Sequence, residues 1–119
     1  MKASREIDRQ TAERILKYID DLARIFRSEN IETYQCLKDS LSAKYASTQL
    51  LTNIYELTKL MRGETLSNMK NFYTPELRRT RNVASHDYSA VDFRSVHFLC
   101  VTLMGKKVRE ELGRLANGD

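Results

Sequence analysis

The stretch IDRQTAERILKYIDDLARIF (residues 7–26) decides the fold. Its apolar residues recur every three or four positions, so they share one face of a helix, and charged residues occupy the opposite face. This pattern predicts a long amphipathic helix whose apolar face packs against other helices. The residues expected to point inward are Ile15, Leu16, Ile19, Leu22, Ala23 and Phe26.

A second long amphipathic segment follows over residues 41–61. Arg62 and Gly63 are expected to close this helix, because a cation suits the last turn and glycine can take the left-handed conformation that ends a helix. We expect a short helical turn over residues 32–38, and a loop with room for one helical turn over residues 64–73. The residues of the second long helix expected to point inward are Leu41, Tyr45, Leu50, Ile54, Leu57, Leu60 and Met61.

The clearest helix start in the sequence is Thr74-Pro75. It combines a capping hydroxyl with a proline at the first helical position. The helix that begins there is expected to be short, because Asp92 has the character of a cap for a final helix. That final helix is expected over residues 93–115 and to continue through Gly105.

Composition excludes most other folds. With 119 residues, the chain is long enough for one domain and too short for a doubly wound nucleotide-binding fold or a (β/α)₈ barrel. Four glycines and one proline leave few of the turns that a sandwich or barrel of short strands would need. We therefore predict an all-α, compact helical bundle of three long helices and one short helix, forming a single domain over residues 1–119.

Cysteine usage and hydropathy indicate the compartment. Cys36 and Cys100 could form at most one disulfide, and no secretory leader is recognisable, so we expect both to be reduced in a cytoplasmic protein. The longest nearly apolar stretch, residues 96–104, is much shorter than the about 20 residues that span a bilayer. No membrane passage is expected.

The net charge of +4 is concentrated in one window. Between residues 59 and 81, six basic residues stand against two acidic ones, so this window carries the whole surplus. A local basic excess favours a polyanion as partner, although a solvated basic helix face would give the same pattern. The basic residues are Lys59, Arg62, Lys70, Arg78, Arg79 and Arg81.

Metal binding and cysteine catalysis find little support in the sequence. No Glu-x-x-His pair of the di-iron type occurs. His97 and Cys100 could face one side of a helix as two zinc ligands, but nothing else completes a tetrahedral set. Both cysteines lie in apolar periodic contexts, which favours core packing, and no Gly-rich phosphate loop occurs. We expect no metal site and no cofactor.

The segment LRRTRNVASHDY (residues 77–88) holds the remaining candidate residues. On a helix, Asn82 and His86 lie about 40° apart with Arg79 near the same stripe, whereas Arg81 lies about 140° from His86. Arg81 could still approach the imidazole if the helix unwinds after Ser85, or the neighbouring group could come from a second subunit. The alternative interpretation is a basic solvent face with one incidental histidine.

This segment resembles the signature of the HEPN superfamily (higher eukaryotes and prokaryotes nucleotide-binding domains). Arg81-x4-His86-x-Tyr88 is similar to the Arg-x4-His-x-Tyr motif of the HepT toxins, and the order of the expected helices is similar as well. Members of that family often carry a Gly-Glu pair in the long second helix, where this chain has Tyr55-Glu56.

The resemblance implies a metal-independent endoribonuclease that acts as a homodimer. RNA supplies its own nucleophile, the 2′-hydroxyl, so cleavage requires proton transfer and stabilisation of the developing charge. The resemblance assigns proton transfer to His86 and charge stabilisation to Arg81, and it lets Asn82 orient the phosphate or the imidazole. The cations that would hold the RNA backbone are Arg78, Arg79 and Lys70.

The resemblance also implies a toxin–antitoxin pair. In such toxins the motif tyrosine, here Tyr88, is adenylylated by a minimal nucleotidyltransferase that serves as the antitoxin, and the added charge would exclude RNA from the site. Two other hypotheses stay open. The domain could be a non-catalytic helical module that binds a nucleotidyltransferase or nucleic acid, or a dimeric scaffold in which the motif stabilises the interface.

Overall fold

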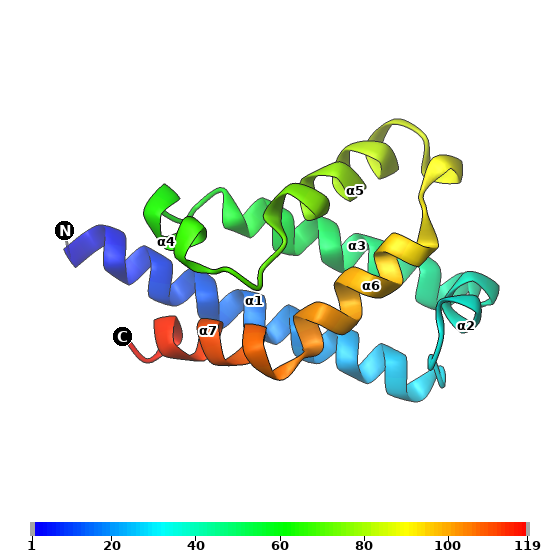
Figure 1. Cartoon of the computed structure of the whole chain (residues 1–119), viewed down its shortest axis with the longest axis horizontal. Coiled ribbons are helices and arrows are strands. Elements are labelled where there is room, and N and C mark those ends of the chain that lie inside the picture. The colour runs from blue at the N-terminus through cyan, green and yellow to red at the C-terminus, as the bar shows by residue number, and fades with distance from the viewer. Residues whose placement is uncertain (1, 119) are drawn as a thin grey trace.

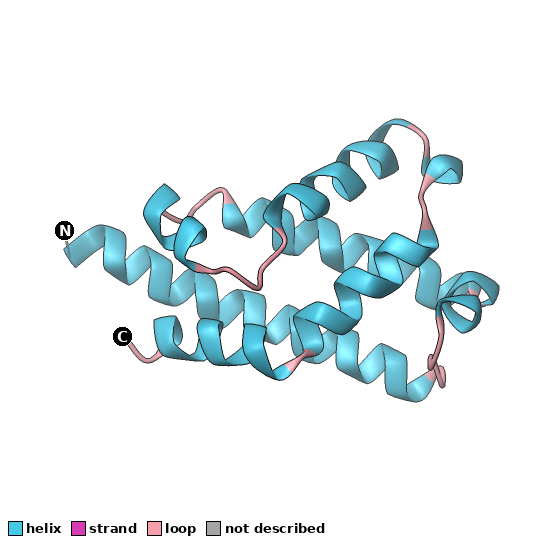
Figure 2. Ribbon diagram, in the orientation of Figure 1, coloured by secondary structure: helices cyan, strands magenta, loops and turns pink. Residues whose placement is uncertain are grey.

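The computed structural model describes the backbone of residues 2–118 and the side chains of residues 5–118. Every regular element in this range is helical, and Figure 2 shows only helices joined by loops. The predicted all-α bundle is therefore confirmed. The elements are α1 (Lys2–Ser28), α2 (Tyr34–Asp39), α3 (Leu41–Thr58), α4 (Gly63–Asn68), α5 (Thr74–His86), the 3-10 helix η1 (Tyr88–Ala90), α6 (Phe93–Met104) and α7 (Lys106–Ala116).

The long helix α1 is the centre of the packing. It lies against α3 on one side and α7 on the other, and α3 in turn packs against α5 (Figure 1). The apolar stripe predicted for this helix is confirmed at Ile15, Ile19 and Leu22, which are fully buried. The helix ends at Ser28 because Asn30 takes a left-handed backbone conformation with φ of 54°.

The inward face of α3 differs from the prediction. Leu41, Tyr45 and Leu60 were expected inside, but they are 66%, 54% and 52% exposed. Small residues take their places, because they let neighbouring helices approach α3 closely and hydropathy gives them little weight. The buried residues of α3 are Ala43, Ser47, Thr48, Leu51, Ile54, Tyr55, Leu57 and Thr58.

The end of α3 also differs from the prediction. The helix stops at Thr58, whose hydroxyl donates to the Tyr55 carbonyl at 2.6 Å, and Gly63 begins α4 instead of terminating α3. Arg62 is held by Asp8 of α1, with its backbone N–H 3.1 Å and its Nε 2.8 Å from the carboxylate oxygens. This contact fixes the direction in which the chain leaves α3.

The predicted final helix over residues 93–115 is two helices. Asp92 caps α6 as expected, because its side chain accepts the Arg94 N–H at 3.0 Å. Gly105 then takes an extended conformation, which separates α6 from α7. Arg109 stabilises the break by donating to the Met104 carbonyl and to Asp20 of α1, each at 3.0 Å. As a result α7 runs along α1 while α6 crosses toward η1 (Figure 1).

The start of α5 was predicted one residue too late. The helix already includes Thr74, and Tyr73 occupies the capping position without a side-chain bond. The Thr74 hydroxyl donates backward to the Phe72 carbonyl at 3.4 Å, so it is no cap. Pro75 does lie in the first turn, as predicted. Among the described residues, no helix is both long and apolar enough to cross a membrane.

Candidate nucleic-acid interface

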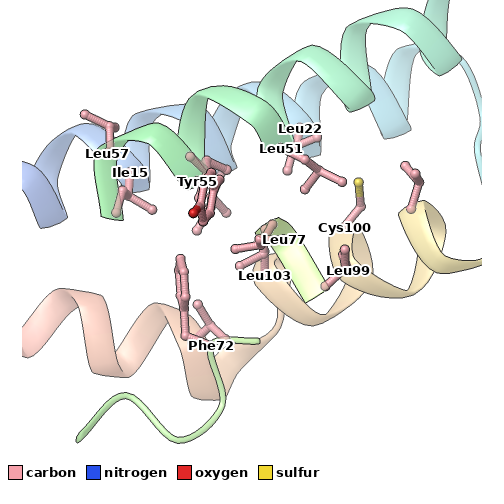
Figure 3. Close-up of a cluster of buried hydrophobic side chains, with 14 of the residues drawn as sticks. Ile15, Leu22, Leu51, Tyr55, Leu57, Phe72, Leu77, Leu99, Cys100 and Leu103 are labelled. Carbon is pink, nitrogen blue, oxygen red and sulfur yellow. The ribbon is translucent and has the colours of Figure 1, made fainter. Parts of the chain in front are cut away.

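Helix α5 presents the residues of the motif on two different sides. It anchors itself on the bundle through Leu77, which is fully buried, and Thr80, which is 8% exposed. Figure 3 shows Leu77 in the same apolar cluster as Tyr55 of α3. The opposite side of α5 is exposed, so the helix offers a row of polar side chains to solvent. The residues of that row, called the α5 face below, are Arg78, Arg79, Asn82 and His86.

Arg81 lies on the side of α5 that contacts α3. Its guanidinium carbon is 5.0 Å from the centre of the Tyr55 ring, and its Nε is 3.4 Å from a carboxylate oxygen of Glu56. The side chain is 26% exposed, while its Nε is buried and has no hydrogen-bond partner among the described residues. Arg81 is thus oriented by an aromatic face and a loose ion pair, which leave most of its donors free for another ligand.

The same two residues of α3 also hold Lys59. Its ammonium is 3.0 Å from the second carboxylate oxygen of Glu56 and 5.3 Å from the centre of the Tyr55 ring. One carboxylate and one ring therefore serve two cations, so the neighbourhood keeps a net positive charge. An anion such as a phosphate group would complete this balance.

His86 is the last residue of α5 and is exposed. Asp87, the next residue, does not orient the imidazole, because its carboxylate accepts the N–H and the hydroxyl of Ser89 at 3.1 Å and 2.6 Å. The His86 side chain is therefore open to solvent.

One chain does not bring Arg81 and His86 together. The two residues lie about 140° apart around the helix, and the structure directs one toward α3 and the other to solvent. Lys70 is also separated from His86, because it precedes the N-terminal end of α5 and a helix of 13 residues is about 20 Å long. The α5 face and Arg81 thus form two adjoining cationic surfaces.

Tyr88 is enclosed by other rings. It stacks on Tyr45 of α3 with ring centres 4.5 Å apart and planes within 6°, and Phe93 packs against it at 5.9 Å. Its hydroxyl is buried and has no hydrogen-bond partner within the part of the chain that the structure describes. Burial raises the pKa of Tyr88 above its ordinary value, and the nearby Thr48 hydroxyl opposes part of that rise.

The remaining candidates are structural. Cys100 is fully buried, and burial raises the pKa of its thiol, so it is a core residue as predicted. Cys36 is partly exposed, and the Thr33 hydroxyl, which donates to its sulfur at 3.4 Å, lowers its pKa. His97 is half-buried beside Phe26, and burial lowers its pKa. No group of three potential metal-ligating side chains occurs among the described residues.

The fold and the surface define the class of this protein, because comparison with known proteins finds no match. No protein-family model, no curated protein and no solved structure matches the chain. The chain is an all-α bundle with a basic helix face and an adjoining arginine held by α3. Sequence reasoning assigned no role to Tyr55 and Glu56. The only signal was their position at the site where the resemblance places a Gly-Glu pair.

Proposed function

We propose that the protein is a metal-independent endoribonuclease of the HEPN, HepT-like type, acting as a homodimer. The observation that carries this proposal is the oriented Arg81 guanidinium, which keeps free donors while Tyr55 and Glu56 fix its position. Arginine offers a permanent charge and a planar fork of donors to phosphate oxygens. The exposed His86 on the same helix supplies an imidazole, the side chain that most often transfers protons in catalysis.

The chemistry follows from these two side chains. His86 removes the proton of a 2′-hydroxyl, and the 2′-oxygen forms a bond to the neighbouring phosphorus. The bond from phosphorus to the 5′-oxygen then breaks, that oxygen takes a proton from water, and His86 returns its proton to the solvent. The products are a 2′,3′-cyclic phosphate and a 5′-hydroxyl end. Arg81 stabilises the charge that develops on the phosphate oxygens.

A second subunit is part of the proposal because Arg81 and His86 face different directions in one chain. An apolar patch offers a surface for that contact: Tyr73, Phe98 and Val101 are 41%, 53% and 49% exposed. Tyr73 and Phe98 meet edge to face at 5.5 Å, and Val101 lies one turn beyond Phe98 on α6. Contiguous exposed apolar surface of this kind is typical of interaction sites.

The nuclease proposal is tested with purified protein and RNA in excess EDTA. We expect cleavage that leaves 2′,3′-cyclic phosphate ends and is lost in His86→Ala. Lys107→Ala, an exposed cation on α7, is the matched control and should cleave normally. Cleavage that persists unchanged in His86→Ala would identify a contaminating nuclease and remove the support for this function.

The shared site is tested by mixing two inactive chains. If Arg81 and His86 act together across a dimer, co-expressed Arg81→Ala and His86→Ala chains should recover about one quarter of the wild-type activity, because half of the random dimers contain one intact site out of two. Phe98→Glu should prevent both dimerisation and recovery. A dimer that stays inactive in the mixture would contradict the shared site.

Regulation by a minimal nucleotidyltransferase antitoxin belongs to the same proposal. Transfer of AMP from ATP to the Tyr88 oxygen would release pyrophosphate and place a negative phosphodiester two residues from His86, where RNA phosphate would bind. Because the Tyr88 hydroxyl is buried, η1 has to move away from α3 before the transfer. Co-expression with such an enzyme should add the mass of AMP to the wild type and not to Tyr88→Phe.

A second candidate function is binding without cleavage. The observation that favours it is that Arg81 already has Glu56 as an ion-pair partner and lies away from His86 within one chain. A non-catalytic HEPN-like module would bind nucleic acid through the α5 face, or a nucleotidyltransferase. RNA binding that depends on Arg78 and Arg79, with no turnover under any condition, would support this candidate over the nuclease.

A further inference from the structure

Three aromatic rings from three elements gather at the end of the molecule where α5 finishes. Tyr45 of α3, Tyr88 of η1 and Phe93 of α6 form this aromatic end, with Tyr88 in the middle. Tyr45 covers one face of Tyr88 in a parallel stack, yet it is 54% exposed. Since only one face of the Tyr45 ring is used in that stack, its other face is open to a further planar group.

Cations surround the aromatic end. Lys44 lies 5.6 Å from the centre of the Phe93 ring. Beyond Phe93 is a surface cavity whose lining includes Tyr34, Lys38 and Arg94. Arg94 lies 4.5 Å from the centre of the Tyr34 ring and donates to its hydroxyl at 2.8 Å, so this ring and this cation are held in fixed positions.

The one acidic side chain of that cavity does not cancel these charges. Asp92 is committed to the start of α6, where it accepts the N–H of Arg94 and the hydroxyl of Ser95 at 3.0 Å and 3.1 Å. A carboxylate occupied in this way is partly neutralised by the helix N-terminus. The surface therefore combines the exposed ring of Tyr45 with three cations, Lys38, Lys44 and Arg94, that have no carboxylate partner among the described residues.

The aromatic end adjoins the proposed catalytic residue. Tyr88 follows His86 by two residues, and Asp87 between them caps η1. Figure 1 shows the end of α5, η1 and the start of α6 as consecutive turns of the chain at one end of the bundle, and α2 with the start of α3 lies at that end too. A strand cleaved at His86 would thus have its neighbouring nucleotide beside Tyr45.

We propose that the aromatic end is a subsite that takes an unpaired nucleotide of single-stranded RNA, with the base stacked on the open face of Tyr45 and the phosphate held by Lys44. This inference rests on the proposed nuclease function and adds the substrate class to it. Every base has a planar face, so such stacking tolerates any sequence, while the cation fixes the backbone. A base in a duplex is already stacked and paired, so the subsite selects single strands or loops.

The test uses full-length protein with the His86→Ala change, so that RNA is bound and not cleaved. A fluorescent single-stranded RNA is titrated, and the affinities of Tyr45→Leu and Tyr45→Phe are compared in that background. Stacking accounts for about a 5- to 160-fold difference in affinity per base. We expect Tyr45→Leu to bind about tenfold more weakly or worse, and Tyr45→Phe to bind normally because a phenyl ring keeps the stack.

An abasic RNA separates stacking from a structural role of Tyr45. When the base beside the cleavage site is removed, Tyr45→Leu should cost no further affinity, because the partner of the ring is already missing. A cost of equal size on intact and abasic RNA would show that the change acts through distortion of Tyr88, and it would overturn the subsite. Equal affinity of the His86→Ala protein for single-stranded and duplex RNA would overturn it as well.

The outcomes also distinguish this inference from the nuclease itself. If RNA is cleaved and Tyr45→Leu changes neither binding nor cleavage, the subsite is wrong and the nuclease stands. If RNA is bound in a Tyr45-dependent way but is never cleaved, the subsite stands on a binding module. If the wild type neither binds nor cleaves RNA, both proposals are wrong.

Discussion

Two arginines join helices to carboxylates in this molecule, and they do so in different ways. Arg62 meets Asp8 through its backbone N–H and its Nε, at 3.1 Å and 2.8 Å, and its terminal nitrogen reaches Glu64 at 3.0 Å. Arg81 has only one ion-pair contact, 3.4 Å from Glu56, and a buried Nε without a hydrogen-bond partner among the described residues. The first arginine is therefore held by two carboxylates, whereas the second is positioned by one loose contact.

The difference indicates what each arginine is for. Asp8 is 2% exposed and also accepts the Thr65 hydroxyl at 2.5 Å, so the Arg62 contact compensates a buried charge and ties α1 to the turn after α3. Arg81 compensates no buried charge, because Glu56 is 46% exposed on its side chain. A guanidinium that is oriented while most of its N–H donors have no partner among the described residues is suited to bind a ligand.

The largest expected effect comes from removing each arginine in turn. If Arg81 stabilises developing charge as proposed, Arg81→Ala should lower RNA cleavage at least about 100-fold, and it should leave the thermal unfolding midpoint nearly unchanged. Arg62→Ala should do the reverse, with a clearly lower midpoint and normal cleavage by the protein that remains folded. Cleavage assays and thermal denaturation on both variants check the pair. If both variants changed cleavage and the unfolding midpoint in the same way, the two arginines would not have different roles.

The second effect concerns stability and pH. Burial raises the pKa of Asp8, but hydrogen bonds from Thr65 and Arg62 outweigh burial and bring that pKa below its ordinary value. A depressed pKa stabilises the fold at pH values above the unfolded pKa of about 3.9, and the stabilisation is lost as the pH falls through the lower folded pKa. Asp8→Asn should therefore cost about 2–3 kcal/mol at pH 7.

Urea denaturation at a series of pH values measures this effect. The difference in unfolding free energy between the wild type and Asp8→Asn should be constant from pH 7 to about pH 5 and should shrink below about pH 4. Glu64→Gln, which removes the exposed partner of Arg62, is the control and should leave the pH dependence unchanged. A difference that does not shrink in acid would mean that the charge of Asp8 is not what stabilises the fold.

The fold could be predicted from the sequence only in part. Large apolar residues at regular spacing identified α1, and the Asp92 cap was recognised from its local chemistry. The buried face of α3 was not predicted, because Ser47 and Thr48 are polar residues and yet lie inside, where the packing of the helices places them. The break at Gly105 was missed because α7 gains its place from contacts with α1, which no local pattern records.

The candidate site was also predictable from the sequence only in part. Arg81 and His86 lie five positions apart in one segment, so a sequence motif could identify them. Tyr55 and Glu56 come from a helix far earlier in the chain, and only the packing of α5 on α3 brings them to Arg81. The helical spacing placed Tyr45 inside, but it is exposed because its ring stacks on Tyr88.

The third effect is smaller and concerns the loose ion pair. Glu56→Gln should lower cleavage about tenfold, since the amide positions Arg81 less firmly, and should change the unfolding free energy by less than about 1 kcal/mol. If Arg81 acts on developing charge, as the proposed nuclease requires, the loss should appear in kcat and not in KM. Glu13→Gln, an exposed carboxylate paired with Arg9 on α1, is the control and should leave cleavage unchanged. An unchanged kcat in Glu56→Gln would show that Arg81 is positioned by Tyr55 alone.

The smallest effect is expected on the α5 face, where Arg78 and Arg79 have no carboxylate partner among the described residues and are exposed. If they hold RNA phosphates, each releases about one counterion, so Arg78→Gln with Arg79→Gln should lower the slope of log affinity against log salt by about one to two. Measured in the His86→Ala background, the weakening should be similar for all RNA sequences, because phosphate contacts carry no base information. The control is Lys106→Gln with Lys107→Gln on α7, because this double change lowers the net charge by the same amount. If both pairs lower the slope alike, RNA is attracted by overall charge and the α5 face has no special role.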